Sequence, residues 1–108
     1  MVLARGERFA PRFVGTVHLP ALPGSARGGD AGQFSEVLER ARRDAATYAA
    51  GGADALIVEN FGDVPFARDR VGAHVVAAMT LAVAAVRDET GLPVGVNVLR
   101  NDVLSAVA

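Results

Sequence analysis

The chain has 108 residues, of which 51% are hydrophobic and 21% are charged, with a net charge of −1 at pH 7. This composition excludes the disordered and fibrous classes and leaves room for one folded domain. The balanced charge produces no field that would attract phosphate backbones, so we expect no nucleic-acid partner.

Cysteine is absent, which excludes a disulfide framework, a thiolate nucleophile and a cysteine-based metal site. Residues 1–12 contain no apolar stretch of signal-peptide length, so we predict a cytoplasmic protein in which they form an N-terminal extension to a domain over residues 13–108. The longest apolar stretch, residues 75–86, is shorter than the roughly 20 residues needed to span a bilayer. We interpret it as a buried helix.

The first predicted strand covers residues 13–17 and is followed directly by His18. Prolines and glycines over residues 20–29 then predict a long loop. From Phe34 onward, apolar residues recur every three or four positions, which predicts an amphipathic helix. The glycine pair 51–52 ends this helix, because glycine adopts the left-handed conformation without a Cβ clash.

A continuous apolar run over residues 55–58 is typical of a strand that is buried on both faces of a parallel sheet. The loop over residues 60–72 leads to a second helix with an apolar stripe, which Gly91 and Pro93 close. A third strand over residues 94–98 precedes a further helix.

The order β-α-β-α-β-α predicts the α/β class, as a (β/α)8 barrel or a doubly wound sheet. Polar residues follow every strand, and the first loop lacks a glycine-rich dinucleotide turn. Both features favour the barrel.

In a parallel βα fold, the residues that follow the strands converge on one end of the sheet, where a ligand can bind. Three polar clusters occupy these positions in the chain. They are His18 after the first strand, Glu59 with Asn60 and Asp63 after the second, and Asn97 with Arg100, Asn101 and Asp102 after the third.

Glu59 ends an apolar run, and a carboxylate against an apolar wall suits a general acid or base near neutral pH. The alternative is a structural role, in which it accepts loop N–H groups or pairs with Arg100. His18 fits an acid–base role, a phosphate contact, metal binding with Glu59 or Asp63, or a structural hydrogen bond to the adjacent loop. Because HxH and HExxH spacings are absent, we predict no metal site.

Asn97 alternates with Val96 and Val98, so its side chain points to the opposite face of the strand. Ligand orientation and an internal hydrogen-bond network both fit this placement. Arg100 suits a phosphate or carboxylate, with a solvated surface charge as the alternative. We expect Asn101 or Asp102 to cap the following helix in preference to acting in catalysis.

Three segments carry a resemblance to a known family: VHLPALPGSAR over residues 17–27, IVENFGDVPF over 57–66 and PVGVNVLRND over 93–102. In order and spacing they resemble the BtpA/SgcQ family over nearly the whole chain after Phe13. The resemblance implies a TIM-type barrel related to the ribulose-phosphate-binding barrels. It places the three segments at the barrel mouth and specifies no cofactor. We assign Glu59, His18 and Asp63 to catalysis there, and Asn60, Asn97, Arg100, Asn101 and Asp102 to substrate binding.

The resemblance implies two functions. The family's namesake is associated with the biogenesis and stabilisation of photosystem I as an extrinsic thylakoid protein, which implies a non-catalytic factor in peripheral contact with a membrane complex. SgcQ-like members accompany sugar-uptake genes and are regarded as nucleosidase or sugar-phosphate enzymes. They imply a small phosphorylated or nucleoside-like ligand, with Glu59 as acid or base.

A complete barrel takes about 250 residues, so the sequence predicts a truncated barrel of about three βα units, without the phosphate-binding loops that follow strands seven and eight. A third reading is therefore a product without independent activity. An open edge at the third strand predicts oligomerisation, or association with the remainder of a barrel.

Overall fold

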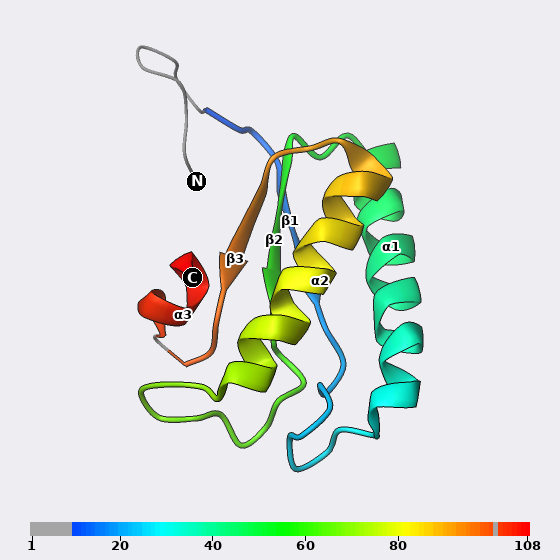
Figure 1. Ribbon diagram of the computed structural model, residues 1–108. Helices are drawn as coiled ribbons and strands as arrows, with labels where there is room; N and C mark the ends of the chain where they lie inside the picture. Colours follow the sequence, from blue (N-terminus) through cyan, green and yellow to red (C-terminus); the bar gives the residue numbers. More distant parts are fainter. Residues whose placement is uncertain (1–9, 101) are drawn as a thin grey trace.

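The chain forms three strands joined by helices, and the computed structural model describes residues 10–100 and 102–108 (Figure 1). This order confirms the predicted α/β class and corresponds to part of a (β/α)8 barrel. The strands are β1 (Val14–His18), β2 (Ala55–Glu59) and β3 (Val94–Asn97). The helices are the short 3-10 helix η1 (Ala31–Gln33), α1 (Phe34–Ala50), α2 (Ala73–Thr90) and α3 (Val103–Val107).

The sheet has the strand order β1-β2-β3, and both pairs are parallel. All three strands therefore end at the same end of the molecule, where the loops into η1 and α1, into α2 and into α3 also gather (Figure 1). In the register of the two ladders, His18 pairs with Glu59, and Glu59 pairs with Asn97. The last residues of the three strands thus form one line across the sheet.

Helices α1 and α2 pack against each other and cover one face of the sheet (Figure 1). Strand residues that point to this face are buried, among them Val17, Leu56 and Val58, each at most 1% exposed. Because side chains alternate along a strand, Thr16, Ile57 and Glu59 point to the opposite face, which we call the open face.

The apolar core lies between the sheet and the two long helices. Helix α1 contributes small and branched side chains at the predicted three- and four-residue spacing, and helix α2 contributes a longer apolar stripe. Both helices bury alanines, whose small side chains permit close packing. The buried helix residues are Val37, Ala41 and Ala45 of α1, and Val75, Ala78, Met79, Ala82, Ala85 and Val86 of α2.

The predicted elements agree with the structure to within about one residue. Strand β1 begins and ends one residue later than predicted, β2 includes Glu59, and β3 ends one residue earlier. Both predicted glycine stops are confirmed, because Gly52 has φ +95° after α1 and Gly91 has φ +67° after α2. The short helix η1 was not predicted, and it lies between the glycine-rich loop and α1.

The free edge of β1 is partly covered by Tyr48 of α1. Its hydroxyl donates to the Thr16 carbonyl oxygen at 3.0 Å, and its ring lies over Gly15. Phe13 meets the same ring edge to face, with centroids 6.1 Å apart. Within the described ranges, no helix has both the length and the apolar character that crossing a membrane requires.

The packing of Tyr48 on Gly15 gives a stability prediction with an internal control. A Cβ at Gly15 would lie closer than 3.0 Å to the Tyr48 ring, whereas a Cβ at Gly95, on the open face of β3, would lie 3.6 Å from its nearest neighbour, Ile57. Gly15→Ala should therefore lower the free energy of unfolding by about 1–3 kcal/mol. Gly95→Ala should leave it unchanged or raise it by up to about 1 kcal/mol. Urea unfolding followed by circular dichroism measures both, and equal effects at the two glycines would contradict the packing described.

Candidate functional site

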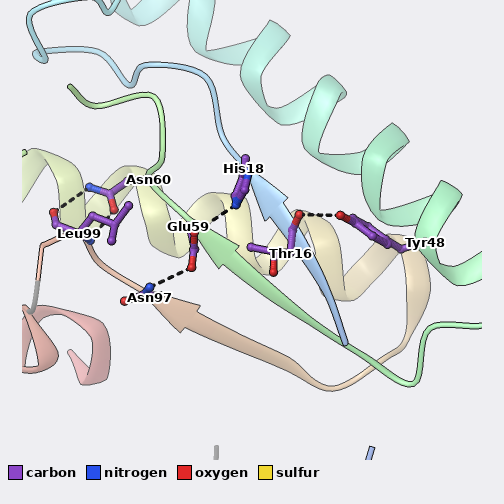
Figure 2. Close-up of polar contacts among 7 residues, drawn as sticks. All are labelled: Thr16, His18, Tyr48, Glu59, Asn60, Asn97 and Leu99. Carbon is purple, nitrogen blue, oxygen red and sulfur yellow. Dashed lines mark hydrogen bonds and ion pairs between the residues drawn. The ribbon is translucent and has the colours of Figure 1, made fainter. Parts of the chain in front are cut away.

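His18, Glu59 and Asn97 form a row at the carboxyl end of the sheet, on the open face (Figure 2). Glu59 Oε2 lies 3.2 Å from His18 Nε2, and Asn97 Nδ2 donates to Glu59 Oε1 at 2.9 Å. Each oxygen of the central carboxylate therefore contacts a nitrogen from one neighbouring strand. The strand register and the side-chain contacts place the same three residues together.

The row is partly open to solvent. The His18 side chain is 49% exposed and the Glu59 side chain 20% exposed. An ion pair at this exposure stabilises a fold by at most about 1 kcal/mol, because water screens it. The contacts therefore matter mainly for the orientation of the side chains, with the Glu59 carboxylate held between an imidazole and an amide.

Phe61, in the loop after β2, stacks on the His18 ring. The two ring centroids lie 4.3 Å apart, with an angle of 14° between the ring planes. The Phe61 side chain is otherwise exposed. Sequence reasoning missed this residue, and the only signal for it is an aromatic side chain two positions after the strand-end glutamate.

Asn60 is buried, at 1% exposure, and holds the loop after β3. Its Oδ1 accepts from the Leu99 backbone N–H at 2.6 Å, and its Nδ2 donates to the Leu99 carbonyl oxygen at 3.2 Å (Figure 2). The side-chain amide thus pairs with both main-chain groups of Leu99. Asn60 lies one residue after the end of β2, and Leu99 lies two residues after the end of β3. This pairing continues the connection between these strands after the ladder has ended.

Asp63 is also buried and connects the loops after β1 and β2. Its Oδ1 accepts from the Leu22 N–H at 2.7 Å, and its Oδ2 accepts from Asn60 Nδ2 at 3.3 Å. The same two loops meet at Gly62, whose N–H donates to the Leu19 carbonyl oxygen at 2.9 Å. A Cβ at Gly62 would collide with the backbone of the first loop, so this approach requires glycine.

Asp102 is the N-cap of α3, which confirms the prediction that it caps this helix. Its Oδ1 accepts from the Ser105 N–H at 3.1 Å, while Oδ2 accepts from the Ser105 hydroxyl at 2.6 Å and from the Val71 N–H at 2.7 Å. The Ser105 hydroxyl, followed by the Val71 N–H, lowers the pKa of Asp102 below its ordinary value of 3.8. The residue thereby joins the start of α3 to the loop that precedes α2.

The remaining predicted site residues lie apart from the row. Arg100 is exposed beyond β3, and its backbone N–H donates to the Ala67 carbonyl oxygen at 3.3 Å. Asn101 lies outside the described residues. In the part of the chain that the structure describes, no group of three or more His, Cys, Asp or Glu residues is placed to hold a metal ion.

A parallel sheet with helices packed on one face and polar residues at the strand ends defines the chain as part of a (β/α)8-barrel protein. A profile of the BtpA family matches residues 10–108. The chain therefore belongs to the BtpA family, as the three sequence segments indicated.

Relatives of the chain occur in bacteria, archaea and an animal. It is 53% identical to the photosystem I biogenesis protein BtpA of Synechocystis, over 88% of this chain and 32% of that protein. It is 50% identical to an uncharacterized protein of Pyrococcus furiosus, over 87% of this chain and 35% of the relative. It is also 36% identical to an uncharacterized mitochondrial protein of Caenorhabditis elegans, over 67% of this chain and 25% of the relative. No solved structure matches the chain.

The chain spans about a third of the length of the curated relatives that it matches, for example 32% of the Synechocystis protein and 35% of the Pyrococcus furiosus protein. Residues 10–108, which the family profile matches, contain the ends of all three strands and the whole His18–Glu59–Asn97 row.

The buried Asn60 amide gives a second stability prediction. Asn60→Ala removes both bonds to Leu99 and one to Asp63, and it leaves main-chain groups without partners, so the free energy of unfolding should fall by about 2–3 kcal/mol. Asn97→Ala is the matched control, because it removes one exposed amide bond and should cost less than about 1 kcal/mol. Thermal and urea unfolding measure both variants. A smaller loss for Asn60→Ala than for Asn97→Ala would contradict the structural role of Asn60.

The hydrogen bonds of Asp102 predict a pH dependence. Its pKa in the folded chain lies below the ordinary 3.8, so the carboxylate stabilises the fold fully above that value. This stabilisation is lost as the pH falls through the folded-state pKa. Asp102→Asn should therefore flatten the decline of Tm between about pH 5 and pH 2. Ser105→Ala removes the hydroxyl that lowers the pKa of Asp102 most, so it should flatten the decline of Tm in part. An unchanged Tm profile in Asp102→Asn would show that these bonds do not act on the carboxylate.

Proposed function

We propose that the chain supplies part of the active site of a barrel enzyme that acts on a sugar-phosphate or nucleoside-like substrate. Glu59 belongs to an acid–base pair with His18 at this site. The observation that carries the proposal is the central position of Glu59, whose two oxygens contact nitrogens from both neighbouring strands. In (β/α)8 enzymes, catalytic residues come from the ends of several strands on this side of the barrel. The chain belongs to the BtpA family. The SgcQ-like members of that family are regarded as such enzymes, which supports the proposal.

The acid–base pair acts by moving one proton. In cleavage or isomerisation of a sugar derivative, a base removes a proton from a hydroxyl or a carbon, and the resulting acid returns a proton to the leaving group or to a neighbouring carbon. The 3.2 Å separation of His18 Nε2 and Glu59 Oε2 allows the two groups to share this task. Their partial exposure leaves the pair accessible to a substrate.

The other predicted residues take supporting roles in this proposal. The Asn97 amide donates to Glu59 and lies on the same open face of the sheet, so it can orient a substrate hydroxyl. The exposed Arg100 guanidinium suits a phosphate or carboxylate of the ligand. The polar side-chain atoms of Asn60 and Asp63 form hydrogen bonds with the loops. We therefore propose that both residues position the site and do not contact the substrate directly. Asp102 positions α3 in the same sense, and Asn101 stays a sequence-based prediction.

A chimera tests the proposal in a full-length context. Residues 10–108 of this chain replace the matching third of the Synechocystis relative, and the product is assayed against a panel of pentose phosphates, hexose phosphates and nucleosides. Glu59→Gln should lower kcat/KM by about 10²–10⁴-fold on any compound that is turned over, because it removes the carboxylate of the acid–base pair. Glu89→Gln, exposed at the far end of α2, is the control and should leave turnover unchanged. Equal turnover in the chimera and its Glu59→Gln variant would refute the role of Glu59.

The 53% identity to a photosystem I biogenesis protein favours a second candidate function. In that alternative, the whole protein is a non-catalytic factor that binds a membrane complex peripherally. The same chimera distinguishes the two candidates in a Synechocystis strain that lacks its BtpA, with photosystem I content as the measurement. A non-catalytic factor would restore the complex with or without Glu59→Gln, whereas an enzyme would restore it only when Glu59 is intact.

A further inference from the structure

Resting on the proposed function, we infer that His18 Nδ1 is the atom that accepts the substrate proton, and that Glu59 and Phe61 are positioning residues for the His18 imidazole. This assignment divides the acid–base pair into a proton acceptor and an orienting carboxylate. It also gives Phe61 a role that follows from its stacking on His18.

The first step of the argument concerns the tautomer of His18. A neutral imidazole carries its proton on one nitrogen and a lone pair on the other, and an ionised carboxylate can only accept hydrogen bonds. Nε2 lies 3.2 Å from Glu59 Oε2, so the carboxylate favours the tautomer with the proton on Nε2. The lone pair then resides on Nδ1, the ring nitrogen that Glu59 does not contact.

The second step concerns the position of the carboxylate. Glu59 Oε1 accepts from Asn97 Nδ2 at 2.9 Å, which holds the carboxylate from the side opposite to His18. A carboxylate fixed in this way sets the tautomer and direction of the imidazole and stabilises the imidazolium after proton uptake. The Asn97 amide is thus a second partner of the carboxylate, and it keeps Glu59 from turning away from His18 when a substrate enters.

The third step concerns the plane of the His18 ring. The terminal side-chain torsion of a histidine has a broad distribution of angles, so the ring plane is not fixed by the side chain itself. Phe61 covers one ring face, with centroids 4.3 Å apart and planes within 14° of parallel, which restricts that rotation. The loop that carries Phe61 is itself fixed by Asn60 before it and by Gly62 after it. Phe61 is therefore supported by the scaffold and not by the histidine alone.

The proton transfer balances with the groups present. The Nδ1 lone pair forms a bond to a proton of a substrate O–H or C–H group, and the electron pair of the broken bond stays on the substrate. The imidazole becomes an imidazolium, with its Nε2–H still directed at the Glu59 carboxylate. Return of the Nδ1 proton to the leaving group, or to a neighbouring substrate carbon, regenerates the starting state.

Histidine-selective NMR of the chain tests this assignment without any substrate. The chain has two histidines, His18 and His74, so long-range correlations between ring protons and ring nitrogens can be assigned with a single His74→Gln variant. At about pH 8, where imidazoles are largely neutral, His18 should show a protonated Nε2 and an unprotonated Nδ1. Glu59→Gln should shift the two nitrogens toward the averaged pattern of mixed tautomers. A protonated Nδ1 in the unmodified chain would overturn the inference.

A second set of variants tests Phe61. Phe61→Leu should remove the ring-current shift of the His18 ring protons and bring its nitrogens toward tautomer averaging, whereas Phe61→Tyr should preserve both signatures. Phe13→Leu is the matched control, because the Phe13 ring packs edge to face on Tyr48, whereas the ring stacked on His18 is that of Phe61. His18 signals that are identical in the unmodified chain and in Phe61→Leu would exclude Phe61 as a positioning residue.

Kinetics in the chimera connect the assignment to turnover. Phe61→Leu should lower kcat by about 10- to 100-fold with KM unchanged, since misplacement of a reacting group by about 1 Å costs this much. Phe61→Tyr should restore the rate. The two proposals fail separately, because the His18 tautomer is read without substrate. A folded chimera without turnover on the panel would count against the enzyme, whereas an Nδ1–H tautomer would count against the proton acceptor assigned here.

Discussion

The parallel register of β1, β2 and β3 is the constraint on which the site depends. A slip of one residue in either ladder would turn a strand's side chains to the other face of the sheet. Burial of Val17 and Val58 against the helices opposes such a slip, because each is almost completely removed from water. The apolar side of the sheet therefore determines where the polar side chains of His18, Glu59 and Asn97 meet on the open side.

Two hydrogen-bond systems at the strand ends differ in what they stabilise. Bonds within the His18–Glu59–Asn97 row are partly exposed, and water competes with each of them. The side chains of Asn60 and Asp63 are themselves buried, and they bond to the main chain of the neighbouring loops. The buried system can hold the three loops while the row exchanges its partners for those of a ligand. This separation of scaffold from reactive surface suits a site that must stay in place when its own contacts change.

Much of the fold follows from the sequence, because its signals are local. The three- and four-residue apolar spacing, the continuous strand at Ala55 and the glycine stops predicted the long elements to within about one residue. The strand-end rule placed His18, Glu59 and Asn97 together before the structure did. The roles of Asn60 and Asp63 were not predictable, since their partners are main-chain groups 39 and 41 residues away, and main-chain partners leave no mark in a sequence. The stacking of Phe61 depends in the same way on the path of a loop.

The hydrogen bonds between the Asn60 side chain and the main chain of Leu99 also have a consequence for position 99. Both bonds go to main-chain atoms of Leu99, so the Leu99 side chain takes no part in them. These two bonds exclude only proline at position 99, because proline has no backbone N–H to donate. Substitutions of Leu99 can thus change the size and polarity of a side chain two residues after Asn97 without removing the hydrogen bonds that hold the loop.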